Sequence, residues 1–180
     1  LGTVPNLWTT EYLSTLASEA EETISVEVPC IYVRFVLPVQ VGVSIYDLTA
    51  LTTPQLLTGI IRITYQGWTV HPAFPNEMRD TVVPFKPGEG DVQSRPFIYL
   101  RQGYGLNSLK FFPAPNTTIP DSGDDITTQT GIRNNVIVSG WRISDQALDY
   151  RIPSHIRFTL VRYYVLARAY KKEGKGQNLE

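Results

Sequence analysis

The chain has 180 residues, of which 42% are apolar and 18% are charged, with 16 basic and 17 acidic side chains. This length is sufficient for one domain with a substantial hydrophobic core. An internal disulfide framework and a thiolate zinc site are both excluded, because Cys30 is the only cysteine. The longest apolar stretch, residues 26–43, is interrupted by charged residues and prolines, so the sequence predicts no membrane span.

The charges are distributed unevenly along the chain. Residues 151–180 contain seven basic and two acidic side chains, whereas residues 1–149 contain nine basic and fifteen acidic ones. A basic end on an acidic body is typical of an interaction surface. Basic residues in the last turn of a helix also suit the helix dipole, so charge alone does not separate the two interpretations.

The first predicted element is an amphipathic helix that ends near Ser25. Thr9 or Thr10 is a candidate N-cap, because a hydroxyl oxygen can accept a hydrogen bond from a free backbone N–H of the first turn. Apolar residues then recur at helical spacing, which predicts one buried stripe: Leu13, Leu16, Ala17, Ala20 and Ile24. The acidic residues Glu19, Glu21 and Glu22 are assigned to the other faces of this helix.

Residues 26–143 read as six or seven short strands separated by turns, because apolar residues alternate between clusters of Gly, Pro, Asn and Asp. Gln66-Gly67 is predicted to form a tight turn, and the prolines after Phe112 are predicted to end a strand. Residues 136–143 are predicted to form a strand pair around Gly140. The polar segment 116–135 is predicted to be an exposed loop that is mobile or ordered only by a neighbouring molecule.

The last predicted element is a long helix that begins near Ser154. Residues 155–172 contain neither Gly nor Pro, and their apolar residues form two adjacent stripes. One packing face cannot cover both stripes, so part of this helix is expected to be covered by the first helix or by another subunit. The predicted fold class is therefore α+β, with a helical bundle formed by the N- and C-terminal helices and a sandwich- or barrel-like β-rich insertion. Residues 1–25 and 150–180 form the helical part and residues 26–149 the insertion, effectively as one structural unit.

No residue pattern in the sequence indicates catalysis. His71 and His155 lack a carboxylate or a nucleophile at diagnostic spacing, and Cys30 lies among apolar residues, as an inert thiol does. The acidic cluster in segment 116–135 lacks the twelve-residue calcium-loop pattern, and no glycine-rich phosphate loop is present. We therefore predict that the protein is not an enzyme and has no catalytic, cofactor-binding or metal-binding residues.

The order of these elements resembles a known family, the head-to-tail adaptors of tailed bacteriophages (the collar, or tail tubular protein A, type). The resemblance covers about residues 8–178 and consists of short segments in a shared order. These segments are Gly42-Val-Ser-Ile-Tyr46-Asp47-Leu48, Tyr65-Gln-Gly67, Phe111-Phe112-Pro113-Ala114-Pro115, Ile152-Pro153-Ser154-His155, Tyr163-Tyr164, Ala167-Arg168-Ala169-Tyr170 and Gly174-Lys-Gly-Gln177.

The resemblance implies a structural virion protein at the neck of the phage particle, assembled in the host cytoplasm. Such adaptors bind the portal as a homo-oligomeric ring, commonly of about twelve copies, and carry the tail nozzle or tube. Duplex DNA passes through the ring without sequence-specific contacts during ejection. The alternatives are another neck or tail-completion protein, or a β-sandwich module that binds carbohydrate or nucleic acid.

Two groups of residues are candidate interfaces under this interpretation. The first group lies on the last helix and is expected to contact the portal or a neighbouring subunit: Arg157, Arg162, Tyr164, Arg168, Tyr170, Lys171, Lys172 and Lys175. The second group lies in the polar loop and is expected to contact the tail component or a neighbour: Asn116, Asp121, Asp124 and Asp125.

Overall fold

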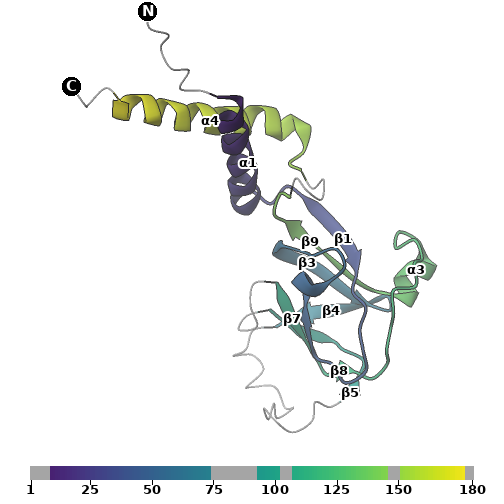
Figure 1. The fold of residues 1–180 in the computed structure, drawn as a ribbon. Coiled ribbons are helices and arrows are strands. Elements are labelled where there is room, and N and C mark those ends of the chain that lie inside the picture. Colours follow the sequence, from purple (N-terminus) through teal and green to yellow (C-terminus); the bar gives the residue numbers. More distant parts are fainter. Residues whose placement is uncertain (1–8, 74–92, 102–106, 146–150, 177–180) are drawn as a thin grey trace, which may run out of the picture. The chain divides into compact units, whose positions relative to one another are not determined.

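The computed structural model describes residues 9–73, 93–101, 107–145 and 151–176. The chain separates into two compact units, one formed by Leu1–Ile31 with Arg142–Glu180 and the other by Tyr32–Trp141. We call them the helical unit and the β unit. Figure 1 shows their elements, which in chain order are α1 (Thr10–Glu27), β1 (Tyr32–Val36), β2 (Ile45–Asp47), η1 (Leu48–Ala50), β3 (Leu57–Tyr65), β4 (Trp68–Pro72), β5 (Gln93–Ser94), β6 (Ile98–Leu100), β7 (Ser108–Phe112), β8 (Ala114–Pro115), α3 (Gln129–Asn134), β9 (Val136–Arg142) and α4 (Ser154–Gly176).

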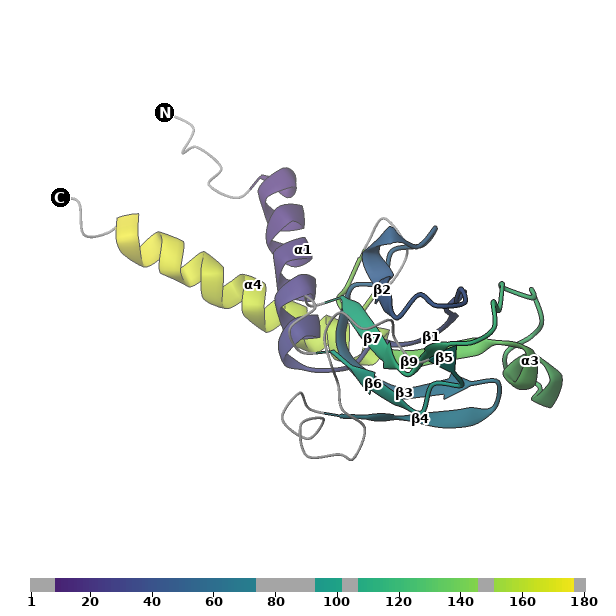
Figure 2. The same cartoon turned by 90° about the horizontal axis from the view of Figure 1, so that it is seen from below.

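The predicted fold class is wrong. Most of the described structure is a curled, mixed, seven-stranded sheet in the order β1-β9-β3-β4-β6-β7-β2, which can be followed in Figure 2. Strands β4 and β6 run parallel, whereas the pairs β1–β9, β3–β4, β6–β7 and β2–β7 are antiparallel. The terminal helices α1 and α4 pack against each other, but two helices leave too little enclosed volume for a bundle core. The sheet, rather than a helical bundle, therefore dominates the architecture.

The turn between β3 and β4 follows from two residues. Gln66 and Gly67 both have positive φ angles, 50° and 85°, and they connect the paired residues Tyr65 and Trp68. Two successive positive φ angles define the tight hairpin turn whose twist matches that of the strands it joins. The predicted turn at Gln66-Gly67 is confirmed.

Strand β9 differs from its prediction, because it runs without interruption through Gly140. A Cβ atom on Gly140 would lie 2.4 Å from the backbone oxygen of Gly59, which is too close for any side chain. Gly140 therefore permits two strand backbones to approach each other and does not mark a turn. The expected strand pair around this glycine is wrong.

The core of the β unit is built from residues that are inaccessible to solvent. Strand β7 is buried along its whole length, including Lys110, so this strand is covered on both faces and shows no polar alternation. The largest side chains among the buried residues include Tyr65, Phe111 and Leu109. Phe111 meets Tyr46 and Tyr65 edge to face, with ring centroids 5.6 and 6.4 Å apart.

Candidate interaction surface on the helical unit

Helix α1 begins at a side-chain cap and buries one stripe. The Thr9 hydroxyl accepts a hydrogen bond from the backbone N–H of Tyr12 at 3.2 Å, which identifies Thr9 as the N-cap. Leu16, Ala20 and Ile24 follow at intervals of four residues and are buried. Three of the five residues of the predicted apolar stripe are therefore buried, whereas Ala17 is partly buried and Leu13 is 38% exposed.

A buried carboxylate joins the two helices of the unit. Glu21 is 1% exposed and forms an ion pair with Arg157 of α4, whose Nε donates to the carboxylate. The Ser144 hydroxyl also donates to Glu21, at 3.4 Å, and the Ser144 backbone N–H donates to the Ser25 hydroxyl at 2.8 Å. The sequence assigned Glu21 to a face other than the apolar stripe, but the structure buries it with that stripe. Its position four residues after Ala17, at the edge of the apolar stripe, was the available signal.

Helix α4 presents large apolar side chains that no described part of its own unit covers. Phe158, Tyr163 and Tyr170 are 74%, 66% and 68% exposed. Leu160 and Leu166 are less open, at 37% and 38%. Each large side chain left in water forgoes on the order of 1.5–3 kcal/mol of burial energy. Large apolar side chains exposed in this number on one helix are typical of a protein that binds a partner.

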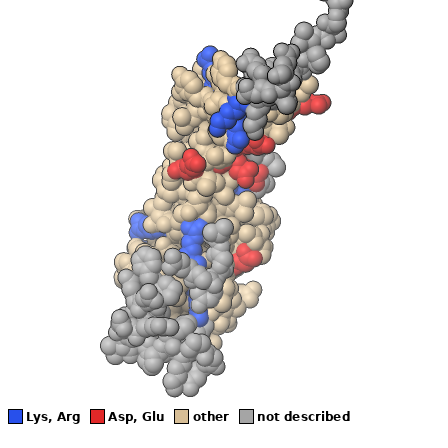
Figure 3. Space-filling model, turned by 90° about the vertical axis from the view of Figure 1, so that its left-hand side faces the viewer, with Lys and Arg blue, Asp and Glu red and all other residues tan. Residues whose placement is uncertain are grey.

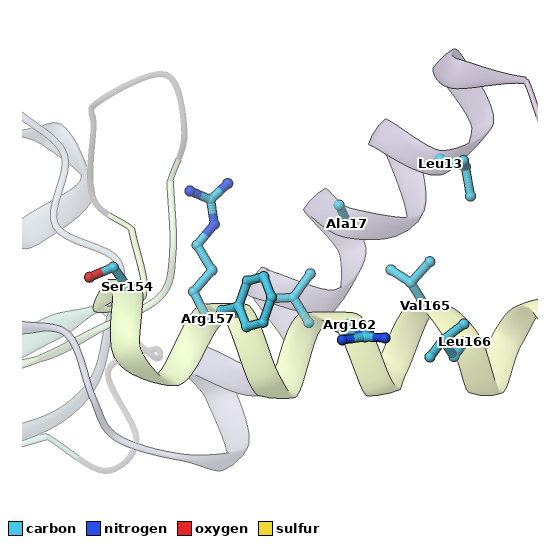
Figure 4. Close-up of a pocket in the computed structure, with 9 residues that line it drawn as sticks. Leu13, Ala17, Ser154, Arg157, Arg162, Val165 and Leu166 are labelled. Carbon is cyan, nitrogen blue, oxygen red and sulfur yellow. The ribbon is translucent and has the colours of Figure 1, made fainter.

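An open groove of about 580 Å³ lies between the two helices. Figure 4 shows side chains of both helices around it. Its lining is mostly apolar, with two arginines and one serine among the nine lining residues, which are Leu13, Ala17, Ser154, Arg157, Phe158, Val161, Arg162, Val165 and Leu166. The groove exists because Ala17 is small, while the neighbouring α4 residues are large but do not reach across.

Among the basic residues of α4 that the sequence singled out, some have partners within the helical unit and others do not. Arg157 is held by Glu21, and the Arg168 guanidinium donates to the Tyr164 hydroxyl at 3.0 Å. Hydrogen bonds from Arg168 and then from Thr23 lower the pKa of Tyr164. Arg162 is exposed at the groove and has no hydrogen bond or ion pair to the rest of the described chain.

The remaining candidates on α4 lie nearer its end. Tyr170 and Lys171 are exposed. Lys172 and Lys175 belong to α4, but their side chains lie outside the described part of the chain. Figure 3 shows the basic and acidic side chains of one face as small separate clusters within a largely uncharged surface.

The polar segment 116–135 belongs to the β unit and has its own internal order, contrary to expectation. Asn135 is fully buried, and its amide donates to the Ser122 hydroxyl at 2.7 Å and to the Gly131 carbonyl at 3.0 Å. The Thr128 hydroxyl caps α3 by accepting from the Gly131 N–H at 3.1 Å. Side-chain hydrogen bonds therefore supply the order that the low apolar content of the segment could not.

The acidic candidates of this segment are engaged in local turns. Asp121 accepts from the Gly123 N–H at 2.9 Å, and Asp125 accepts from the Thr127 N–H at 2.9 Å. Asp124 accepts from the Asn134 amide at 2.7 Å. Asn116, Asp121 and Asp125 are exposed, and Asp124 is partly so.

Acid should weaken the order of this segment once the pH falls below the ordinary aspartate range. Hydrogen bonds from Asn134 and then from Ser122 lower the pKa of Asp124, and hydrogen bonds from Thr127 lower the pKa of Asp125. A lowered pKa in the folded state stabilises the fold above the ordinary aspartate range near 3.9, and this contribution is lost as pH falls through the lowered value. We expect a carboxyl NMR titration of Asp124 to show a midpoint below that range.

The Asn134→Ala variant should move this Asp124 midpoint upward, because it removes the main donor to the carboxylate. Asn116→Ala is the matched control, since Asn116 shares no hydrogen bond with Asp124 among the described residues. An unchanged Asp124 midpoint in the Asn134 variant would contradict the cause assigned here.

His71 and His155 are both exposed, one in β4 and the other in the first turn of α4. Cys30 is partly buried, and this burial raises the pKa of its thiol, which lowers its reactivity at neutral pH. Within the described residues, no group of three or more His, Cys, Asp or Glu side chains could hold a metal ion.

Among the described residues, neither long helix has the length and hydropathy needed to cross a membrane. A comparison of the chain with models of known protein families and with curated proteins finds no match.

Proposed function

We propose that this protein is a head-to-tail adaptor of a tailed bacteriophage. In this proposal it is a non-enzymatic virion protein that forms a ring between the portal and the tail nozzle or tube, and duplex DNA passes through that ring. The observation that carries the proposal is the exposed apolar surface of α4, with Phe158, Tyr163 and Tyr170 each more than half open to solvent. A protein that works alone gains nothing from such a surface, whereas an assembly protein buries it on binding.

The charge of α4 supports the same proposal. Residues 154–176 contain six basic side chains and one acidic one. Charges of one sign at an interface speed association with an oppositely charged partner and select against others. The order of the sequence segments that resemble the adaptors is the second line of support, because it links this helix to a family whose members assemble on a portal.

Electron microscopy of the purified protein, alone and mixed with the portal protein of the same phage, tests the proposal. We expect rings that stack on the portal. The Lys171→Glu, Lys172→Glu double variant should remain folded and bind the portal less tightly, with a smaller difference at high salt. The charge of the exposed Lys171 contributes little to folding, whereas reversing the charge of a basic helix end weakens docking.

The Arg62→Glu variant is the control for this test, because Arg62 is an exposed cation of strand β3 in the β unit. It should bind the portal as the unmodified protein does. A protein that stays monomeric and does not bind the portal at either salt concentration would rule out the adaptor function.

A further inference from the structure

The groove between α1 and α4 selects the secondary structure of whatever binds in it. Both of its walls are helices, whose backbone N–H and C=O groups are bonded within each helix. The groove therefore offers no backbone edge that could pair with an incoming strand. An occupant must satisfy its own backbone hydrogen bonds, and a helix is the segment that does so.

The groove also selects an apolar stripe on that helix. Its walls carry Leu13 and Ala17 from α1, and Phe158, Val161 and Val165 from α4. A polar face laid over these side chains would lose its hydration without gaining hydrogen bonds. The phosphates of a nucleic acid duplex are disfavoured for the same reason.

The charges around the groove favour an occupant helix with acidic residues beside its apolar stripe. Arg162 lies at the groove and has no partner among the described residues, and Arg157 lies at the same groove with its charge balanced by Glu21. By helical spacing, Glu11 and Glu22 of α1 lie on the side away from Leu13 and Ala17. Glu19 acts on Arg168 and Tyr164 of α4, so none of these three carboxylates is assigned to Arg162. The uncompensated charge at the groove is therefore positive.

We infer that this groove binds an acidic amphipathic helix of a partner protein, with the apolar stripe of that helix against α1 and α4 and a carboxylate on Arg162. The inference rests on the proposed function in that the portal is the first partner in which to seek such a helix. A second copy of this chain is a poorer occupant, because its exposed helix α4 carries six basic side chains and one acidic one, so Arg162 would repel it.

A designed peptide tests this inference without knowledge of the natural partner. The probe is a fluorescently labelled helix of about 18 residues, long enough to be helical, with leucines at spacings of three and four and glutamates beside them. Three companion peptides replace the glutamates with glutamine, replace them with lysine, or scramble the order. Binding to the full chain is followed by fluorescence anisotropy.

We expect the acidic peptide to bind, the glutamine peptide to bind more weakly, and the scrambled peptide not to bind. Arg162→Glu should lower the affinity for the acidic peptide by about tenfold, as the loss of one charge-assisted contact does. The same variant should bind the lysine peptide more tightly. Arg62→Glu, which makes the same charge change in the β unit, should alter neither affinity. Circular dichroism confirms that both variants remain folded.

Four outcomes would overturn the inference. Equal affinity of the acidic peptide for the Arg162→Glu variant would remove the proposed contact. Equal binding of the scrambled peptide would show attraction by charge alone. Displacement of the acidic peptide by a short DNA duplex would show the same. Absence of peptide binding, together with self-association that Arg162→Glu weakens in sedimentation, would identify a second copy as the occupant.

The inference and the proposed function fail separately. Rings that stack on the portal from a protein that binds no acidic helix would leave the adaptor function standing and remove the groove's assigned ligand. Peptide binding by a protein that never assembles on a portal would do the reverse.

Discussion

Replacing Phe111 with alanine is expected to lower the free energy of unfolding of the β unit by about 3–5 kcal/mol. Phe111 is fully buried in β7, and its ring meets those of Tyr46 and Tyr65 edge to face. The substitution removes the apolar transfer energy of the ring and leaves a cavity that the surrounding strands can fill only in part. Urea unfolding followed by tyrosine and tryptophan fluorescence measures the loss.

Phe97→Ala is the matched control for this prediction. Phe97 also meets a phenylalanine edge to face, Phe112 at 6.3 Å, but it is 49% exposed. Its loss should cost about 1–3 kcal/mol, from the aromatic pair and the half of the side chain that is withdrawn from water. If both variants lost the same stability, the core of the β unit would not be centred on Phe111.

Local features of the sheet were predictable from the sequence, whereas the order of its strands was not. The turn at Gln66-Gly67 and the end of β7 at Phe112 follow from residues that act on their own neighbours. Strand β2 pairs with β7 through partners such as Ile45 and Lys110, which lie far apart in the chain. No local pattern encodes that pairing. A lysine is typical of an exposed strand position, so Lys110 does not predict that β7 is buried on both faces.

The same division holds for the candidate site. The spacing of apolar residues predicts that α4 carries more apolar surface than one packing face can cover. It does not show that Tyr164 is partly shielded while Tyr163, its neighbour, is 66% exposed. Leu160 and Tyr164 are both open enough that truncation to alanine should cost less than the 2–5 kcal/mol of a fully buried side chain. Exposure depends on the side on which α1 crosses α4, which the sequence of either helix leaves undetermined.

Replacing Arg157 with methionine is expected to lower the stability of the helical unit by about 1–3 kcal/mol. The substitution leaves the carboxylate of Glu21, which is 1% exposed, without its cation. The loss should be smaller than for a fully buried pair, because the Arg157 side chain is 39% exposed and water screens its charge. Glu21→Leu alone should cost less, since the Arg157 guanidinium left behind can reach solvent.

The Glu21→Leu, Arg157→Met double variant should regain most of the stability that Arg157→Met loses, because no buried charge then remains. Urea unfolding with hydrogen exchange at the α1 amides measures all three variants, and Arg162→Met is the control for an exposed arginine on the same helix. Additive losses in the double variant would show that the two side chains are not coupled.

The groove needs Leu13 and Ala17 from one helix and Phe158 from the other, so it persists only while α1 and α4 stay packed. Arg157→Met should therefore also weaken binding of the acidic helical peptide, and the double variant should recover that binding together with its stability.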